Sequence, residues 1–99
     1  MLATQQQIEA FIAEHSSWRY DRAVGALCRD LTFGNFFQAI EFIRCGAEAA
    51  EQLDHHPEWS NVYNRVWVKL ISHDAGGVTE RDFKLAVQLE RCAIELGAE

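Results

Sequence analysis

Three histidines and two carboxylates in the second half of the chain have types and spacing suited to proton transfer. Glu51 and His55 stand four residues apart, so they share one face of a helix, and His56 follows directly. His73 and Asp82 lie farther along the chain. An imidazole has a reference pKa of about 6.5, and a nearby carboxylate stabilises its charged form. Such groups predict general acid–base chemistry, which typically accelerates a reaction about 10²–10⁴-fold.

Each of these features also has a purely structural interpretation. His55 and His56 precede Pro57, which ends a helix, and they could simply complement the helix dipole there. His73, taken alone in a loop, would most often be a solvated residue. Glutamate and histidine at this spacing can also ligate a metal, but no second closely spaced pair of ligands accompanies them. We therefore expect no metal.

The composition is that of one globular domain covering residues 1–99. Hydrophobic residues make up 48% of the chain and charged residues 24%. The net charge of −6 and the scatter of the basic residues disfavour direct binding to nucleic acid. No apolar run reaches the roughly 18 residues of a membrane span, and the start of the chain lacks a secretory signal pattern. We expect a cytoplasmic protein that does not bind membranes.

The cysteines show no pattern typical of a disulfide framework or a zinc site. Cys28, Cys45 and Cys92 are odd in number, far apart and in no Cys-x-x-Cys motif. Because free cysteines are commonly buried, we expect reduced thiols in the interior.

Hydrophobic periodicity predicts three helices and four strands in the order αββαββα. Thr79 with Asp82 three residues later resembles a capping box, and Asn35 is the expected N-cap of the middle helix. A tight turn is expected at Asn64-Arg65, because asparagine tolerates a positive φ. The fold class is therefore α+β: a four-stranded antiparallel sheet with three helices on one face. The predicted elements are a helix from Thr4 to about His15, strands near 18–20 and over 27–33, a helix over 35–53, strands over 59–63 and 66–72, and a helix after Thr79.

Two of these helices carry more apolar surface than one core face requires. In each, the apolar positions fill roughly half of the circumference, against the ~100° stripe that covers a sheet. The middle helix could therefore be well covered in a monomer, or it could also face another subunit, and we expect a homodimer or homotetramer formed through it. The positions are Phe36, Ile40, Phe42, Ile43, Gly46, Ala47, Ala49, Ala50 and Leu53 in the middle helix, and Phe83, Ala86, Val87, Leu89, Ala93, Ile94 and Leu96 in the last.

The stretches around the histidines resemble the pterin-4a-carbinolamine dehydratase family. The motif of that family is Glu, three residues, His-His-Pro, five residues, an aromatic residue, nine residues, His, and then Asp. Trp18 and the segment 33–36 are also similar to the family, so the resemblance extends from about residue 18 to the C-terminus. Every spacing is kept, with Glu51, His55, His56, Pro57, Tyr63, His73 and Asp82.

This resemblance implies an activity and a set of site residues. The reaction would remove water from 4a-hydroxytetrahydropterin and give quinonoid dihydropterin, which recycles the cofactor of aromatic amino-acid hydroxylases without a metal or organic cofactor. His55 and His73 would be general acids for the two stereoisomers of the substrate, and His56 would mainly hold the pterin. Glu51 and Asp82 would be supporting carboxylates. The implied substrate-binding set is Asp54, His55, His56, Trp59, Ser72, His73 and Asp74.

A second hypothesis is a non-catalytic binding module that acts through the middle helix. In the family, animal members dimerise a homeodomain transcription factor, and other relatives assist enzyme assembly. A pterin-dependent hydroxylase or a regulatory protein would then be the partner. The wide apolar arc of residues 36–53 motivates this alternative. The complete set of three histidines favours the enzyme.

Overall fold

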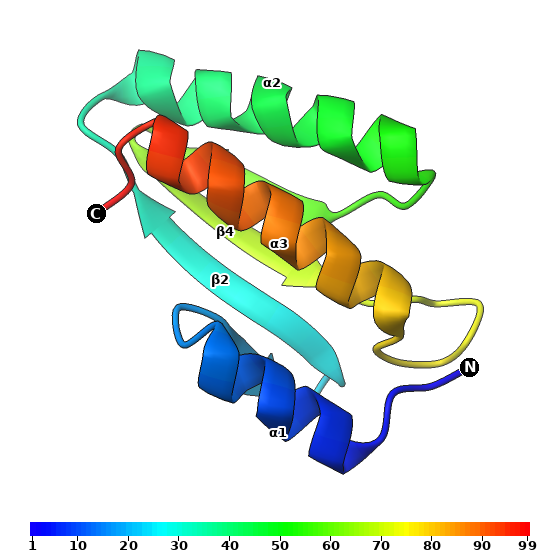
Figure 1. Ribbon diagram of the computed structural model, residues 1–99. Coiled ribbons are helices and arrows are strands. Elements are labelled where there is room, and N and C mark those ends of the chain that lie inside the picture. Colours follow the sequence, from blue (N-terminus) through cyan, green and yellow to red (C-terminus); the bar gives the residue numbers. More distant parts are fainter.

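The computed structural model describes the whole chain, residues 1–99, and contains three helices and one four-stranded antiparallel sheet (Figure 1). The strands have the spatial order β1-β2-β4-β3. The α+β class and the order αββαββα predicted from the sequence are confirmed. The elements are α1 (Gln5–Glu14), β1 (Arg19–Asp21), β2 (Ala26–Thr32), α2 (Phe36–Leu53), β3 (Glu58–Val62), β4 (Arg65–Leu70) and α3 (Glu80–Glu95).

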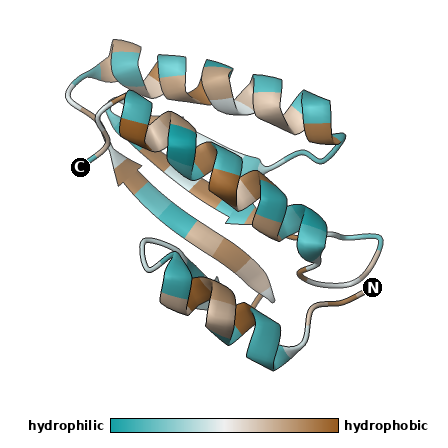
Figure 2. Ribbon diagram, in the orientation of Figure 1, coloured by the Kyte–Doolittle hydropathy of each residue, from teal (hydrophilic) through white to brown (hydrophobic).

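The helices cover one face of the sheet, and α2 and α3 pack along each other (Figure 1). Alternate residues of the two central strands point into this layer, where Leu27, Leu31, Val66 and Val68 are buried in a single core. Figure 2 shows brown and teal residues alternating along each helix, which is the pattern of an amphipathic helix. No helix is both long enough and apolar enough to cross a membrane.

The helix starts follow the capping signals of the sequence. Thr4 and Thr79 each form a capping box, the first with Gln7 and the second with Asp82. Asn35 accepts a hydrogen bond from the backbone N–H three residues later, as expected of an N-cap. These three local signals therefore fix where each helix begins.

The turn between β3 and β4 lies one residue earlier than predicted, at Tyr63-Asn64. Tyr63 has the positive φ, 51°, and Arg65 already belongs to β4. The side chain of Asn64 donates instead to the carbonyl of Phe33, and Asn61 donates to two carbonyls across the turn. These side-chain bonds position both asparagines, so the prediction based on asparagine's tolerance of positive φ was wrong.

Arg29 interrupts the apolar pattern of β2 because it forms an ion pair inside the helix layer. Its Nε and Nη2 lie 2.9 and 3.1 Å from the two carboxylate oxygens of Glu90 on α3. The indole N–H of Trp18 donates to the same carboxylate at 3.0 Å. Both charged side chains are largely buried, so the pair links β2 to α3.

Replacing Glu90 with glutamine is expected to destabilise the fold by about 3 kcal/mol, because the guanidinium of Arg29 is left buried without a countercharge. Chemical denaturation of wild type and variant measures the difference. Glu95→Gln, on the exposed side of the same helix, is the control. Equal losses in the two variants would contradict the structural role of the ion pair.

Two of the three cysteines are not reduced thiols, and that prediction was wrong. Cys45 of α2 and Cys92 of α3 form a disulfide, with their Cα atoms 6.0 Å apart. Their separation of 47 residues gives no motif, but the packing of α2 against α3 brings them together. Gly46 permits this close approach, because a Cβ there would lie 2.6 Å from a methyl of Leu89. Only Cys28 is a free, buried thiol, and burial raises its pKa.

The helices leave some predicted core residues in solvent. Ile94 is 73% exposed, while Leu85, which the predicted apolar arc omitted, is buried. At the start of α2, the side chains of Phe36, Phe37 and Ile40 are also exposed, Phe37 by 79%. The apolar arc of α2 thus extends beyond the part that the sheet covers.

Candidate active site

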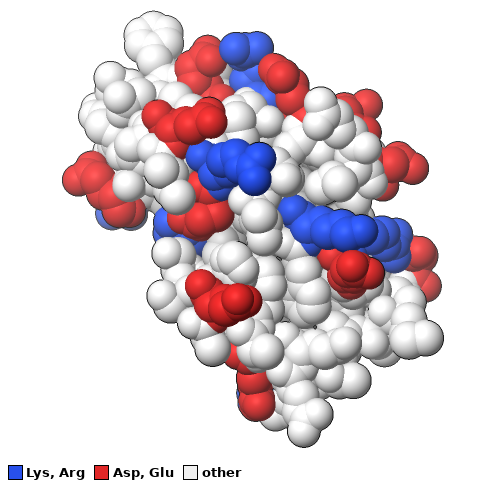
Figure 3. Space-filling view, in the orientation of Figure 1, with Lys and Arg blue, Asp and Glu red and all other residues white.

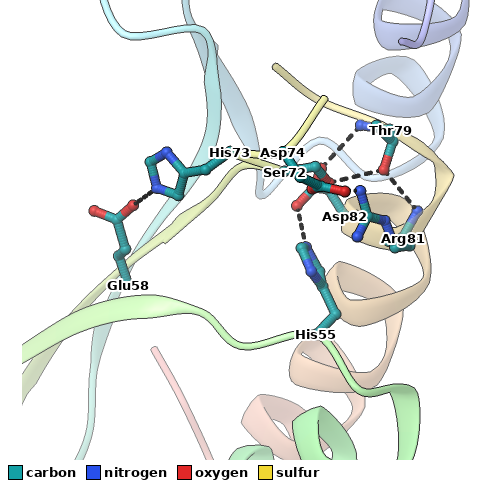
Figure 4. Close-up of polar contacts among 8 residues, drawn as sticks. All are labelled: His55, Glu58, Ser72, His73, Asp74, Thr79, Arg81 and Asp82. Atoms are coloured by element: carbon teal, nitrogen blue, oxygen red, sulfur yellow. Dashed lines mark hydrogen bonds and ion pairs between the residues drawn. The ribbon is translucent and has the colours of Figure 1, made fainter. Parts of the chain in front are cut away.

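His55 lies just past the end of α2 and is held by a buried carboxylate. Asp54 ends the helix in the left-handed conformation, with φ 50°, and turns the chain inward. The Nε2 atom of His55 then lies 2.6 Å from Oδ1 of Asp82 (Figure 4). The side chain of His55 is 9% exposed and that of Asp82 is fully buried. The orientation of this imidazole is therefore fixed by the interior of the protein.

Asp82 joins three segments of the chain at this point. Its second oxygen accepts hydrogen bonds from the hydroxyl of Ser72, at 2.8 Å, and from the backbone N–H of Thr79, at 2.9 Å. The hydroxyls of Ser72 and Thr79 lie 2.8 Å apart (Figure 4). Asp82 is thus both the capping residue of α3 and the partner of His55, so folding and the candidate chemistry depend on the same carboxylate.

The other two imidazoles also have a carboxylate partner, but at the surface. Nε2 of His56 lies 2.6 Å from Oε1 of Glu51, which comes from the last turns of α2. Nε2 of His73 lies 2.6 Å from Oε1 of Glu58, the first residue of β3 (Figure 4). Both pairs are exposed to solvent. Sequence reasoning identified Glu51 and missed Glu58.

All three pairs use the same ring nitrogen, which determines what the free nitrogen can do. A carboxylate accepts at Nε2, so the neutral ring carries its hydrogen there and has a lone pair at Nδ1. The protonated ring carries a hydrogen at both nitrogens. Each Nδ1 can therefore accept a proton in one state and donate one in the other.

The three imidazoles are connected to one short segment, residues 55–58. His55 and His56 belong to it, and His73 is hydrogen-bonded to its last residue, Glu58. Ser72, which precedes His73, reaches the carboxylate that holds His55. The end of α2, the start of β3, the loop after β4 and the start of α3 thus meet at this end of the sheet.

Three residues of the implied substrate-binding set, Trp59, Asp54 and Asp74, make no side-chain hydrogen bond to Ser72 or to the imidazoles. The ring of Trp59 packs on α2, edge-on to Phe42, and is partly buried against the core. Asp54 is exposed and makes no side-chain hydrogen bond. Asp74 pairs with Arg81 at 2.8 Å. Trp59 is partly buried, and it also lines a hollow over the outer face of the sheet.

The site is an open surface and not an enclosed cavity. The nearest hollow, about 370 Å³, lies over the outer face of the sheet and includes Glu58 and Lys69 but none of the three imidazoles. No three side chains of metal-ligating type gather in the structure. Figure 3 shows acidic and basic side chains interspersed on the face it draws, without a continuous basic area. A small ligand would thus meet the His56 and His73 pairs at the surface, while the His55–Asp82 pair lies beneath it.

The Asp74–Arg81 pair gives the chain a weak pH dependence. The hydrogen bond from Arg81 lowers the pKa of Asp74 below its ordinary value. Any stability from this pair is therefore complete above pH about 4 and is lost as the pH falls towards the lowered pKa. Asp74→Asn should be slightly less stable than wild type in thermal melts at pH 7, and the difference should disappear in acid. A difference that grows in acid would contradict this assignment.

Comparisons with known proteins agree on one family. The family model described as pterin 4 alpha carbinolamine dehydratase matches residues 1–92. A protein from Rhizobium johnstonii is 49% identical over 86 residues, which are 87% of this chain and 85% of the relative. One from Solibacter usitatus is 42% identical over 90 residues, 91% of this chain and 93% of the relative. Both are provisionally named pterin-4-alpha-carbinolamine dehydratases.

The fold comparison points the same way. A crystal structure described as a transcriptional coactivator/pterin dehydratase from Brucella melitensis matches with a TM-score of 0.90 and 36% identity. The match covers 94% of this chain and 99% of the other. This chain therefore belongs to the pterin-4a-carbinolamine dehydratase family.

Proposed function

We propose that this chain dehydrates 4a-hydroxytetrahydropterins to quinonoid dihydropterins. The observation that carries the proposal is the set of three imidazoles, each paired through Nε2 with its own carboxylate at 2.6 Å. The family supports a pterin as the substrate class. Recycling the pterin cofactor of aromatic amino-acid hydroxylases in the cytoplasm is the role that would follow.

The reaction requires one proton to be delivered and another to be removed. The hydroxyl on C4a leaves as water once an imidazolium Nδ1 protonates it, and the C4a–O bond breaks. The electron pair on N5 forms the new N5=C4a bond, and the N5 hydrogen passes to a neutral imidazole. One proton is given and one is taken, so the net protonation of the protein is unchanged, and proton exchange with solvent restores the two imidazoles without a metal or organic cofactor.

We assign these steps to particular histidines on the strength of the family resemblance. His55 and His73, which come from different segments of the chain, would each protonate the hydroxyl of one of the two C4a stereoisomers. His56 follows His55 directly and would hold the pterin, with Glu51 fixing its ring. The carboxylates are not reacting groups in this scheme. They orient the rings through the hydrogen bonds at Nε2.

The test is the rate of quinonoid dihydropterin formation from a synthetic carbinolamine. Wild type is compared with the double variant His55→Ala, His73→Ala. We expect the double variant to lose about 10²–10⁴-fold in rate, which is the range typical of general acid–base catalysis. A wild-type rate no higher than that of the double variant would refute the proposal.

A second candidate function is protein binding through α2, and one specific observation favours it. Phe36, Phe37 and Ile40 form an exposed apolar area at the start of that helix. A homodimer or homotetramer would cover it, as would a hydroxylase or a regulatory protein. Ile40→Glu should then dissociate the assembly in sedimentation experiments and leave turnover intact. An unchanged sedimentation coefficient, with no partner lost in a pull-down, would exclude this role.

A further inference from the structure

We infer that Glu58 is a positioning residue for His73, an inference that rests on the proposed dehydratase function. Nε2 of His73 lies 2.6 Å from Oε1 of Glu58, and this is the only side-chain hydrogen bond of the His73 ring (Figure 4). Glu58 lies within the five-residue interval of the family motif at which no residue type is specified. The motif therefore gives no reason to expect a role for it.

His73 needs such a partner more than His55 does. It belongs to the loop between β4 and α3, and its side chain is 75% exposed. Burial against Asp82 fixes the ring of His55, but no packing restricts the ring of His73 in this way. The hydrogen bond to Glu58 is what selects one orientation of the His73 ring.

Glu58 is itself held in place by the sheet and by the preceding proline. It is the first residue of β3 and stands opposite Lys69 in the β3–β4 register. Its Oε2 lies 4.0 Å from Nζ of Lys69, while Oε1 faces His73. Pro57 has a restricted φ, which limits how the segment carrying His55 and His56 joins the strand. The imidazole of His73 is thereby hydrogen-bonded to the first residue of the strand that follows the His55-His56 segment.

This arrangement determines the chemical form in which His73 meets the substrate. A carboxylate at Nε2 favours the tautomer with hydrogen on that nitrogen, so Nδ1 exchanges protons with the C4a hydroxyl. Glu58 neither gives nor takes a proton. Its effect is on the orientation and tautomer of His73, so its loss should lower kcat with little change in KM.

The experiment compares Glu58→Gln, His73→Gln and the double variant, assayed separately with the 4aR and 4aS carbinolamines. Glu58→Gln should lower kcat about tenfold or more, a part of the 10²–10⁴-fold range of acid–base catalysis. The loss should appear with the same epimer that His73→Gln affects and be absent with the other. In the double variant, Glu58→Gln should cause no further loss, because the two residues act as one unit.

Two controls separate this inference from folding and from the proposed function. Glu58 is 49% exposed, so thermal melts of Glu58→Gln should match wild type. Glu9→Gln, on the exposed side of α1, removes an equivalent charge away from the site and should keep full kcat. If wild type dehydrates the carbinolamines and Glu58→Gln equals Glu9→Gln, or loses rate equally with both epimers, the positioning role is refuted. If wild type shows no dehydration, the result refutes the proposed function itself, and this outcome is distinct from a failure of the positioning role.

Discussion

Asp82→Asn is expected to lose both stability and turnover, more than any other single change at the candidate site. The carboxylate is fully buried and accepts hydrogen bonds from Ser72, Thr79 and the ring of His55. An amide in its place turns one acceptor atom into a donor that faces other donors. Leaving a buried donor without its acceptor costs about 1–3 kcal/mol, and loss of His55 as an oriented acid costs about 10²-fold in rate.

Chemical denaturation and the carbinolamine assay measure the two losses on the same preparation. Glu80→Gln is the matched control, because it removes a carboxylate from the same first turn of α3 at an exposed position. It should show little change in either measurement. If Asp82→Asn has the stability and rate of Glu80→Gln, then Asp82 neither anchors α3 nor orients His55.

Reduction of the Cys45–Cys92 disulfide is expected to lower the free energy of unfolding by about 4 kcal/mol. The bond closes a loop of 47 residues, and the chain-entropy model gives about this value for a loop of that length. Wild type in reducing buffer should therefore unfold like the double variant Cys45→Ser, Cys92→Ser. Because the cytosol keeps most thiols reduced, the reduced form is the one relevant to the proposed cytoplasmic location.

The control for this prediction is Cys28→Ser, which leaves the disulfide intact. Its stability should respond to reductant as strongly as wild type does, since Cys28 is a separate, buried thiol. Wild type that unfolds identically with and without reductant would show that the bond between α2 and α3 contributes nothing in solution.

Local signals in the sequence predicted most of the fold. The caps at Thr4, Asn35 and Thr79 are decided by hydrogen bonds within a few residues, and the structure contains all three. The apolar alternation of β2 and β4 is a local signal too, so the α+β order could be predicted. Arg29 was an exception whose reason is tertiary, since its partner, Glu90, is 61 residues away.

The features that the sequence did not predict depend on which segments face each other. Cys45 and Cys92 meet only because α2 packs on α3. Trp59 was expected beside a ligand, but the parity of β3 turns it towards α2. The alternation of side chains along β3 could also have predicted where Glu58 points, because the residue before a core-facing tryptophan points to the other face of the sheet. Its contact with His73 still required the position of the loop after β4.

The proposed function requires that His55, His56 and His73 act on one bound pterin. NMR of the imidazole nitrogens during titration with a stable 7,8-dihydropterin tests this directly. The chain has four histidines, and His15 of the first helix end, whose ring stacks on Phe11 at 4.3 Å, is an internal reference. We expect the signals of residues 55, 56 and 73 to shift together with a single Kd while the signal of His15 stays unchanged. Signals that shift with different Kd values would contradict this expectation. A His73 signal that stays unchanged, as the His15 signal does, would contradict it as well.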